Sequence, residues 1–444
     1  MSSSLAAWMN GQFVGTWTVD RGSHRFTYDE AWLHSPKRRA LSLSLPITPG
    51  LEIRGPAVAN YFDNLLPDNE KIRERLGRRF KIKSTDAFTL LEAIGRDCVG
   101  AVQLLPEGTE PQGWDRIDSE PLTQAQVADI LRAVPSESVL GQGSDDELFR
   151  ISLAGAQEKT ALLFTGREWH RPHGATPTTH ILKLPLGLVG GSRRVDLSDS
   201  VANEWLCAQI LYHLGVPIAP TEMWRFEDQK ALVVTRFDRS WQEHSNGRKW
   251  IARLPQEDFC QALGYPASQK YEKDGGPSIA DCMRLLAGSE DDGDRESFAI
   301  AQLTFWLMAA TDGHAKNFSI FLQPGDAYLT TPLYDVLSIF PYLGDGPNQI
   351  RWRTAGLAFA LRSKNAHYDL HGIQARHWHA LAMQYGGARL WQRMLRHVER
   401  VEAALQSVEN ELPNDFPQRT WLAISKGMRE QAARFRAGLV GLPT

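Results

Sequence analysis

The sequence predicts an α+β fold with a strand-rich first half and a mostly helical second half. Short alternating polar and apolar segments fill residues 5–104 and recur between residues 149 and 237. From about residue 250 the pattern becomes mostly helical. The 444 residues, 42% of them hydrophobic, suffice for two or more packed domains.

The first 105 residues are predicted to form a subdomain of short strands and helices. Strands are expected over residues 7–9 and 13–17, joined by a turn at Asn10-Gly11. A helical pattern follows over residues 56–79 with an interruption at Pro67, and a linker rich in Pro and Gly closes the segment.

One stretch of this subdomain is strongly basic. Residues 71–83 contain seven Lys and Arg side chains against the single acidic Glu74. Such a run could face a nucleic acid or an acidic partner, but a solvated helix face is the more common outcome, and we favour it.

Two strands with a small-residue turn between them come next. Residues 149–153 alternate in polarity, Ala154-Gly155-Ala156 follow, and residues 160–164 resume the strand. Tiny side chains let backbone N–H groups approach phosphate oxygens closely. The segment is neither a Walker A loop nor G-x-G-x-x-G, and taken alone an ordinary hairpin is favoured.

Lys183 lies inside an otherwise apolar, strand-like run over residues 178–185. A lysine buried in a strand is costly unless an anion meets it, and the strand lysine of a protein kinase meets the α/β-phosphates. Glu204, which opens a helical pattern about twenty residues later, is its expected partner. The alternative is a lysine at a sheet edge and a solvated glutamate.

A further strand, residues 231–237, ends in the polar residues Asp238 and Arg239. In a kinase-like small lobe such a strand leads into the hinge that pairs with adenine. Phe237 would then cover the base and Asp238 would reach the ribose. The alternative is an ordinary strand with a charged exit.

The spacing of Asp312, Asn317 and Asp335 completes the pattern. Phosphoryl-transfer enzymes of the kinase type need an Asp at the accepting hydroxyl, an Asn five residues later for Mg²⁺, and a later Asp on the metal that bridges the phosphates. A D-x-x-x-x-N motif by itself is weak evidence for a kinase. The upstream strands make it informative here.

Together these segments resemble the HipA-type serine/threonine kinases, the toxin halves of bacterial toxin–antitoxin pairs. Matching stretches run from about residue 8 to residue 420, among them 61–68, 94–101, 152–159, 254–258 and 310–319. The resemblance implies a bilobal protein-kinase-like fold: an N-terminal subdomain over 1–105, a mixed-sheet N-lobe over 114–245 and an all-helical C-lobe over 246–444.

The family's site residues transfer onto matching positions. Asp312 resembles the catalytic Asp, and Asn317 and Asp335 resemble the Mg²⁺ ligands. The residues expected to line ATP are Ala154, Gly155, Ala156, Gln157, Glu158, Lys159, Lys183, Thr235, Arg236, Phe237, Gln256, His314, Asn317, Tyr334 and Asp335. Thr235 replaces an expected acidic hinge residue, which backbone contacts with adenine would survive.

The resemblance also implies regulation and partners. Ser152 matches the serine at which family members phosphorylate themselves, and a phosphate there would repel ATP beside the phosphate loop. A HipB-like DNA-binding antitoxin is the expected partner, and a protein, such as an aminoacyl-tRNA synthetase, is the expected target. Residues 379–388 contain no Lys or Arg, so DNA is expected to be reached only through the antitoxin.

Composition bounds the remaining choices. A net charge of −3 argues against a dedicated nucleic-acid binder. The four cysteines have no metal-ligand spacing and are typical of reduced thiols in the cytoplasm, where we expect the protein. Residues 298–310 form the most apolar segment and are too short to span a bilayer. Two other functions stay open: a small-molecule kinase of similar design, and a corepressor that has kept the fold without catalysis.

Overall fold

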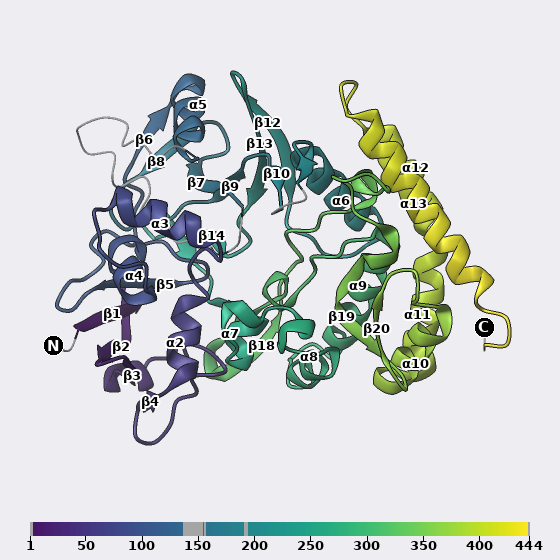
Figure 1. Ribbon diagram of the computed structural model, residues 1–444. Helices are drawn as coiled ribbons and strands as arrows, with labels where there is room; N and C mark the ends of the chain where they lie inside the picture. The colour runs from purple at the N-terminus through teal and green to yellow at the C-terminus, as the bar shows by residue number, and fades with distance from the viewer. Residues whose placement is uncertain (1–2, 136–153, 155–156, 191–193, 443–444) are drawn as a thin grey trace. The chain divides into compact units, whose positions relative to one another are not determined.

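Antiparallel strands in the order β4-β3-β2-β1-β5 form the N-terminal sheet of the computed structural model (Figure 1). The structure describes residues 3–135, 154, 157–190 and 194–442. Helices α2 and α4 pack against this sheet, and the Trp17 and Phe62 rings stack in its core with centroids 3.9 Å apart. The predicted strands at 7–9 and 13–17 and the helix break at Pro67 are confirmed.

The strands have the following bounds: β1 Ser3–Met9, β2 Gln12–Asp20, β3 Ser23–Tyr28, β4 Glu52–Arg54, β5 Val102–Pro106, β6 Ser119–Leu122, β7 Lys159–Phe164, β8 Trp169–Pro172, β9 His180–Lys183, β10 Gly187–Val189, β11 Val195–Leu197, β12 Thr221–Phe226, β13 Gln229–Thr235, β14 Arg239–Glu243, β15 Lys249–Arg253, β16 Gln256–Asp258, β17 Ser319–Leu322, β18 Tyr328–Thr330, β19 Gly356–Arg362 and β20 Ala366–Asp369.

The α-helices have the following bounds: α1 Glu30–Leu33, α2 Pro56–Asp63, α3 Glu70–Arg79, α4 Ala87–Ile94, α5 Gln124–Ala133, α6 Ser200–His213, α7 Phe259–Leu263, α8 Ile279–Leu286, α9 Asp294–Met308, α10 Ala375–Tyr385, α11 Gly387–Glu399, α12 Val401–Glu411 and α13 Gln418–Ala437. None of the helices within the described ranges combines the length and apolarity needed to traverse a bilayer.

The chain divides into two compact units, each built from several stretches. The first unit comprises residues 1–184, 224–268 and 319–328, and the second comprises residues 185–223, 269–318 and 329–444. The N-terminal sheet belongs to the first unit, as do strands β13, β9, β7, β8 and β6 of the six-stranded sheet β12-β13-β9-β7-β8-β6. Apolar side chains of α5 cover the second of these sheets, and Thr123 caps the helix.

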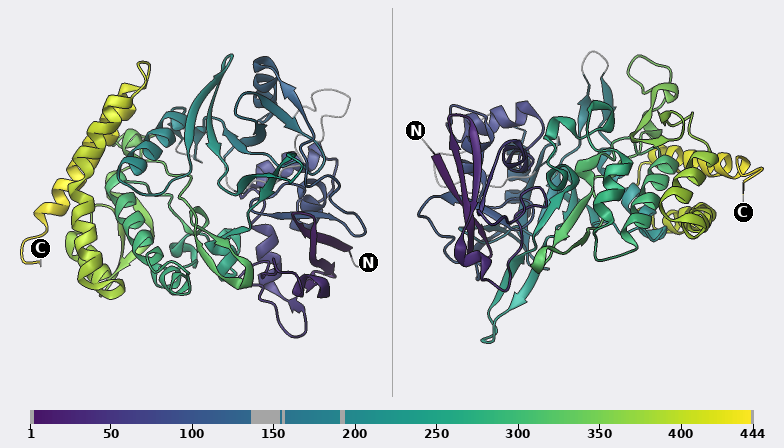
Figure 2. Two further views of the ribbon diagram at one scale, coloured as in Figure 1. Left: turned by 180° about the vertical axis from the view of Figure 1, so that it is seen from behind. Right: turned by 90° about the horizontal axis from the view of Figure 1, so that it is seen from below.

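The second unit is built around α9, whose side chains are almost all buried. Helices α8, α10, α11 and α13 pack against α9, and α12 lies along α13 (Figure 2). The prediction that residues 246–444 are all helical is wrong: β19 and β20 form a hairpin in the second unit, and β15, β16 and β17 belong to the first. These strands are short, and the apolar runs of β17 and β19 resemble buried helix segments in sequence.

Candidate active site

Lys183 lies in the middle of the first unit's second sheet. It ends β9, where it pairs in register with Leu232 of β13 on one side and with Lys159 of β7 on the other. Lys183 is only 4% exposed, as the apolar run around it predicts. A buried ammonium in a central strand requires polar or anionic partners. This burial is the property expected of a lysine that binds phosphate.

The predicted phosphate loop is described only in part. Ser152, Gly155 and Ala156 lie outside the described residues. Lys159 donates to the carbonyl of Ala154, and Gln157 Nε2 donates to the carbonyl of Leu184 at 2.6 Å. The loop's polar side chains therefore fasten its own backbone to the strand that carries Lys183.

The basic run of α3 is partly neutralised within the first unit. Arg75 pairs with the carboxylate of Glu158, and Arg73 Nη1 lies 2.6 Å from Asp63. Lys71, Lys81 and other members of the run remain exposed. The Arg75 contact gives Glu158, which was predicted to line ATP, a structural partner.

The predicted hinge follows β13 directly. The amide of Arg236 donates to the carbonyl of Thr179 at 2.9 Å, and Thr235 pairs with His180 of β9. The Phe237 ring meets the edge of Phe321 with centroids 5.8 Å apart. These contacts hold the hinge backbone against the strand that carries Lys183.

A buried cluster of five charged side chains links the N-terminal subdomain to the hinge. Asp97 accepts from Arg239 at 2.9 Å and from Arg253 at 3.2 Å, and Arg236 Nη2 lies 2.8 Å from Asp238. Burial alone would raise the pKa of Asp97, but the neighbouring guanidinium groups hold it well below its usual range. Losing a carboxylate would leave guanidinium groups unmatched in the interior.

This cluster corrects one expectation for the hinge. The Asp238 carboxylate is buried against Arg236, the Gly100 amide and Gln256 Nε2, so the expected ribose contact is wrong. The Arg236 side chain also belongs to the cluster, and its predicted place in the hinge, which depends on backbone contacts, stays a prediction. Gln256 is buried, and a Cβ on Gly100 would lie 2.7 Å from its carbonyl oxygen.

In the second unit, α9 delivers the predicted catalytic loop. The helix ends at Met308 because Ala309 adopts a left-handed conformation, with φ of 50°. Gly313 lies against the Phe305 ring so closely that a Cβ there would be 2.3 Å from ring carbons. The loop is therefore packed directly on the helix, while the Asp312 side chain is exposed.

Asn317 closes the loop through two reciprocal hydrogen bonds. Its Oδ1 accepts from the amide of His314 at 3.1 Å, and its own amide donates to the His314 carbonyl at 2.9 Å. Both residues are buried. The five-residue spacing from Asp312 thus corresponds to one turn with a fixed geometry.

Asp335 belongs to a segment that is hydrogen-bonded to this loop. The Tyr334 hydroxyl donates to the Lys316 carbonyl at 2.8 Å, so the residues that precede Asp335 and Asn317 are neighbours. Asp335 has a φ of 59°, a left-handed conformation that costs a residue with a Cβ roughly 1 kcal/mol or more. Such strain is concentrated at functional sites.

Helix α6, which carries Glu204, is bound to the same segment. Asn203 Nδ2 donates to the Ser338 carbonyl at 2.8 Å, and the Ser338 amide donates to Asn203 Oδ1 at 3.0 Å. Ser338 Oγ in turn donates to the carbonyl of Met308, the last residue of α9. Glu204 and Lys183 lie in different units, and their pairing stays a prediction.

Tyr271 was not predicted to belong to the site. Its hydroxyl donates to Oδ1 of Asp312, and its ring meets His314 edge-on at 4.9 Å. It lies a few residues before Gly275-Gly276-Pro277, and it had no partner visible in the linear sequence. Asn203 and Asp97 were missed for the same reason.

The oxygen donors present suit magnesium. Mg²⁺ prefers oxygen ligands and is usually held by one or two carboxylates together with substrate phosphates. Asp335 and Asn317 offer a carboxylate and an amide oxygen on neighbouring segments. No cluster of three or more His, Cys, Asp or Glu among the described residues forms an all-protein metal cage.

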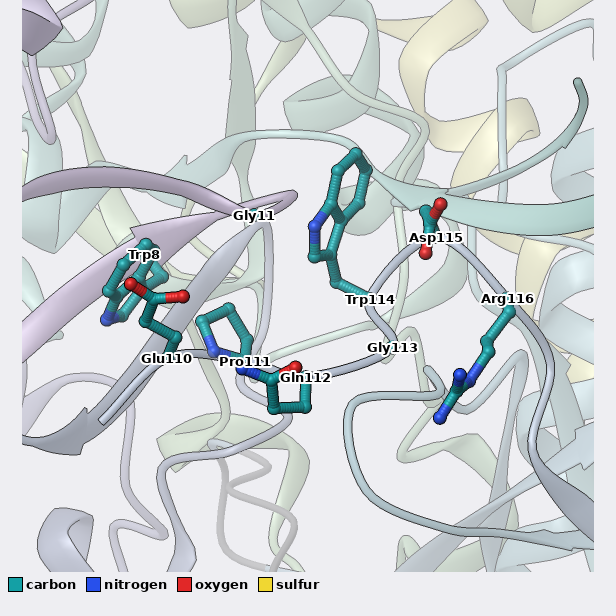
Figure 3. A pocket seen from close by; sticks show the side chains of 9 residues that line it. All are labelled: Trp8, Gly11, Glu110, Pro111, Gln112, Gly113, Trp114, Asp115 and Arg116. Atoms are coloured by element: carbon teal, nitrogen blue, oxygen red, sulfur yellow. The ribbon is translucent and has the colours of Figure 1, made fainter.

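A separate cavity lies between β1 and the linker in the first unit (Figure 3). Trp8, Gly11 and Trp114 contribute to its walls, and Arg248 pairs with the neighbouring Asp115 at 2.6 Å. None of the residues that line it was predicted to bind ATP. It is not part of the candidate active site.

Comparison with known proteins decides the family. The family described as "HipA-like C-terminal domain" matches residues 151–412, more than half of the chain. The chain belongs to the HipA family. Residues 5–105 additionally match the "HipA N-terminal domain", the stretch over which the sequence predicts a separate subdomain.

Curated relatives of this HipA-family chain are kinases by name. Y4mE of Sinorhizobium fredii, which carries a provisional kinase name, is 34% identical over 344 residues, 76% of this chain and 78% of that protein. The serine/threonine-protein kinase toxin HipA of Shewanella oneidensis is 26% identical over 353 residues, 74% of this chain and 73% of the toxin. These names confirm the predicted class of enzyme.

The fold of the HipA family is also matched. HipA from the Shewanella oneidensis MR-1 complex of HipA, HipB and operator DNA superposes with a TM-score of 0.78 at 23% identity, covering 98% of each chain. The predicted α+β, kinase-like fold class is thereby confirmed.

Proposed function

We propose that this chain is an ATP-dependent serine/threonine protein kinase that acts as the toxin of a toxin–antitoxin pair. The observation that supports it most is the second unit's arrangement of Asp312, Asn317 and Asp335 on hydrogen-bonded neighbouring segments. That arrangement occurs in a family whose curated members are named kinases.

In this proposal each predicted site residue has a defined role toward ATP. Lys183 meets the phosphates, the backbone of Thr235 to Phe237 pairs with adenine, and Asn317 and Asp335 hold Mg²⁺, which would neutralise the phosphate charge. Asp312 orients the serine or threonine hydroxyl for in-line attack. Most of the rate enhancement comes from positioning and electrostatic stabilisation.

The proposed target is a protein of translation, with an aminoacyl-tRNA synthetase as the expected substrate, and its inactivation would arrest growth. The proposed partner is a small DNA-binding antitoxin. The Shewanella oneidensis HipA was solved with HipB and operator DNA, which supports such a partner here.

Replacing the predicted catalytic carboxylate tests the kinase activity. Asp312→Asn should lower the rate of phosphate transfer from radiolabelled Mg-ATP to protein by roughly 10²- to 10⁴-fold, because the group that receives the hydroxyl proton is lost. Asp345→Asn changes an exposed carboxylate of the same unit and should leave the rate unchanged. An Asp312→Asn protein as active as the wild type would refute the assigned role.

The same labelled protein tests the proposed off-switch. Peptide mapping after incubation with Mg-ATP should locate one phosphate on Ser152, and Ser152→Ala should stay active for longer. A bare Ser152 after prolonged incubation would contradict self-inactivation.

A further inference from the structure

A tyrosine from a short turn before α8 touches the catalytic loop at two chemically important places. Tyr271 donates its hydroxyl hydrogen to Oδ1 of Asp312, and both residues belong to the second unit. The same ring packs edge-on against His314, with centroids 4.9 Å apart and an interplanar angle of 87°. One side chain therefore contacts both the expected catalytic carboxylate of Asp312 and His314, which is expected to line ATP.

The backbone that carries Tyr271 is fixed by the turn that follows. The amides of Asp274 and Gly276 both donate to the Tyr271 carbonyl at 3.0 Å. A Cβ on Gly276 would lie 1.9 Å from the Gln269 carbonyl oxygen, and Gly275 has a φ of +88°. Only glycines can close the turn this tightly.

Neighbouring residues anchor the turn on both sides. Glu272 is buried and accepts from the Ala360 amide at 2.7 Å and from Arg362 Nε at 3.1 Å, which joins the turn to β19. On the other side, the Lys270 carbonyl accepts from the amide of Ala315 in the catalytic loop at 3.2 Å. These hydrogen bonds fix the turn that carries the Tyr271 hydroxyl.

We propose that Tyr271 is a positioning residue for phosphoryl transfer, and that its hydroxyl holds Asp312 in the orientation that receives the substrate hydroxyl. The inference rests on the proposed kinase function. A carboxylate has about four lone-pair directions, so one phenol leaves room for a second donor. The exposure of Asp312 keeps those directions open to a substrate.

The proposed transfer step balances in bonds and in protons. The oxygen of the substrate serine or threonine forms a bond to the γ-phosphorus of ATP, and its proton passes to Asp312. The bond from the γ-phosphorus to the bridging oxygen breaks, and ADP leaves with that electron pair. Tyr271 keeps its own proton throughout, so its effect depends on the presence of the Asp312 carboxylate.

Removing only the hydroxyl provides the test. Tyr271→Phe in the full chain should lower the maximal rate of phosphate incorporation from radiolabelled Mg-ATP by roughly 10- to 100-fold, since hydrogen bonds to charged groups are the stronger ones. The KM for Mg-ATP and the Kd from calorimetry should change less than about twofold. The phenylalanine ring keeps the contact with His314, so the fold should be retained.

Tyr212→Phe is the matched control. Tyr212 is 69% exposed on α6 in the same unit and also meets a histidine edge-on, His213, with ring centroids 5.3 Å apart. Its loss of a hydroxyl should leave the rate unchanged. A general effect of removing a tyrosine hydroxyl beside a histidine would appear in both variants.

A double variant separates positioning from a purely structural role. In the Asp312→Asn background, Tyr271→Phe should cause no further loss, because the group through which it acts is already gone. An additive loss, an undiminished or raised rate for Tyr271→Phe alone, or phosphate mapped to Tyr271 itself would overturn the inference. If Asp312→Asn is inactive while Tyr271→Phe equals the wild type, only this inference fails. A wild-type chain that transfers no phosphate would overturn the proposed kinase function as well.

Discussion

Glu257 is a carboxyl group that the fold keeps away from water. It lies on β16, is fully buried, and accepts the amide of Leu43 at 2.8 Å through Oε1. Burial raises its pKa to about 8, partly offset by that hydrogen bond. The side chain is therefore mainly protonated at neutral pH, in contrast to the ionised Asp97 nearby in the same unit.

The raised pKa of Glu257 determines how the free energy of unfolding changes with pH. Because the folded state holds the Glu257 proton more tightly than the unfolded state does, its contribution is fully present below about pH 4.3 and is lost as the pH rises through 8. Glu257→Gln should remove this loss, so its free energy of unfolding should gain roughly 4 kcal/mol relative to the wild type as the pH rises from 5 to 9.

Urea unfolding of both proteins at the two pH values checks this prediction. Glu243→Gln, an exposed change in the same unit, should run parallel to the wild type. Parallel pH dependence of wild type and Glu257→Gln would show that Glu257 does not titrate in this range.

At the scale of elements, the amide of Asn203 joins α6 to the segment that carries Asp335. The side chain is fully buried, and it makes hydrogen bonds with both the amide and the carbonyl of Ser338. Asn203→Ala would leave two backbone groups unsatisfied in the interior. We expect a loss of about 2–4 kcal/mol in the free energy of unfolding.

Two measurements check this loss. Chemical unfolding gives the energy, and hydrogen exchange should show faster exchange over residues 333–342 than in the wild type. Asn246→Ala is a matched control, because Asn246 accepts a single amide, that of Arg248, in an exposed turn. Similar losses in both variants would contradict a special role for Asn203.

Elements with strong local signals were predictable from the sequence. Alternation marked β1 and β2, and the apolar run marked α9. The hairpin of β19 and β20 was missed because its apolar strand is short enough to pass for part of a buried helix.

At the scale of the whole molecule, the buried charge cluster shows why residues 1–105 cannot be treated as an appendage. Asp97 accepts hydrogen bonds from Arg239 and Arg253, both more than 140 residues away in the chain. Asp97→Asn should cost about 3–5 kcal/mol in the first unit, since breaking a buried ion pair leaves guanidinium charge unmatched.

The urea midpoint of the full chain measures that cost. Asp115→Asn breaks an exposed ion pair with Arg248 in the same unit and should cost no more than about 1 kcal/mol. Equal midpoints for the two variants would show that burial adds nothing to the Asp97 pairs. The low pKa of Asp97 also predicts that its contribution persists above pH 4 and is lost only in stronger acid.

The candidate site was predictable where chemistry depends on spacing within a short segment. Asp312 and Asn317 are such a pair, and Lys183 stood out as a charge in an apolar strand. Side chains whose partners come from distant segments were not predictable, because the sequence does not say which turns meet. Tyr271 and Asp97 are examples. The corresponding error is Asp238, whose carboxylate was expected to reach the ribose and is instead buried in the charge cluster.

The two hydrogen bonds between Asn203 and Ser338 have a mechanical consequence. Asn203 precedes Glu204 on α6, and Ser338 follows Asp335 in the chain. Because the amide and the carbonyl of Ser338 are both hydrogen-bonded to Asn203, a displacement of α6 would carry the Asp335 segment with it. A ligand that shifts α6 should therefore move Glu204 and the predicted magnesium ligand together.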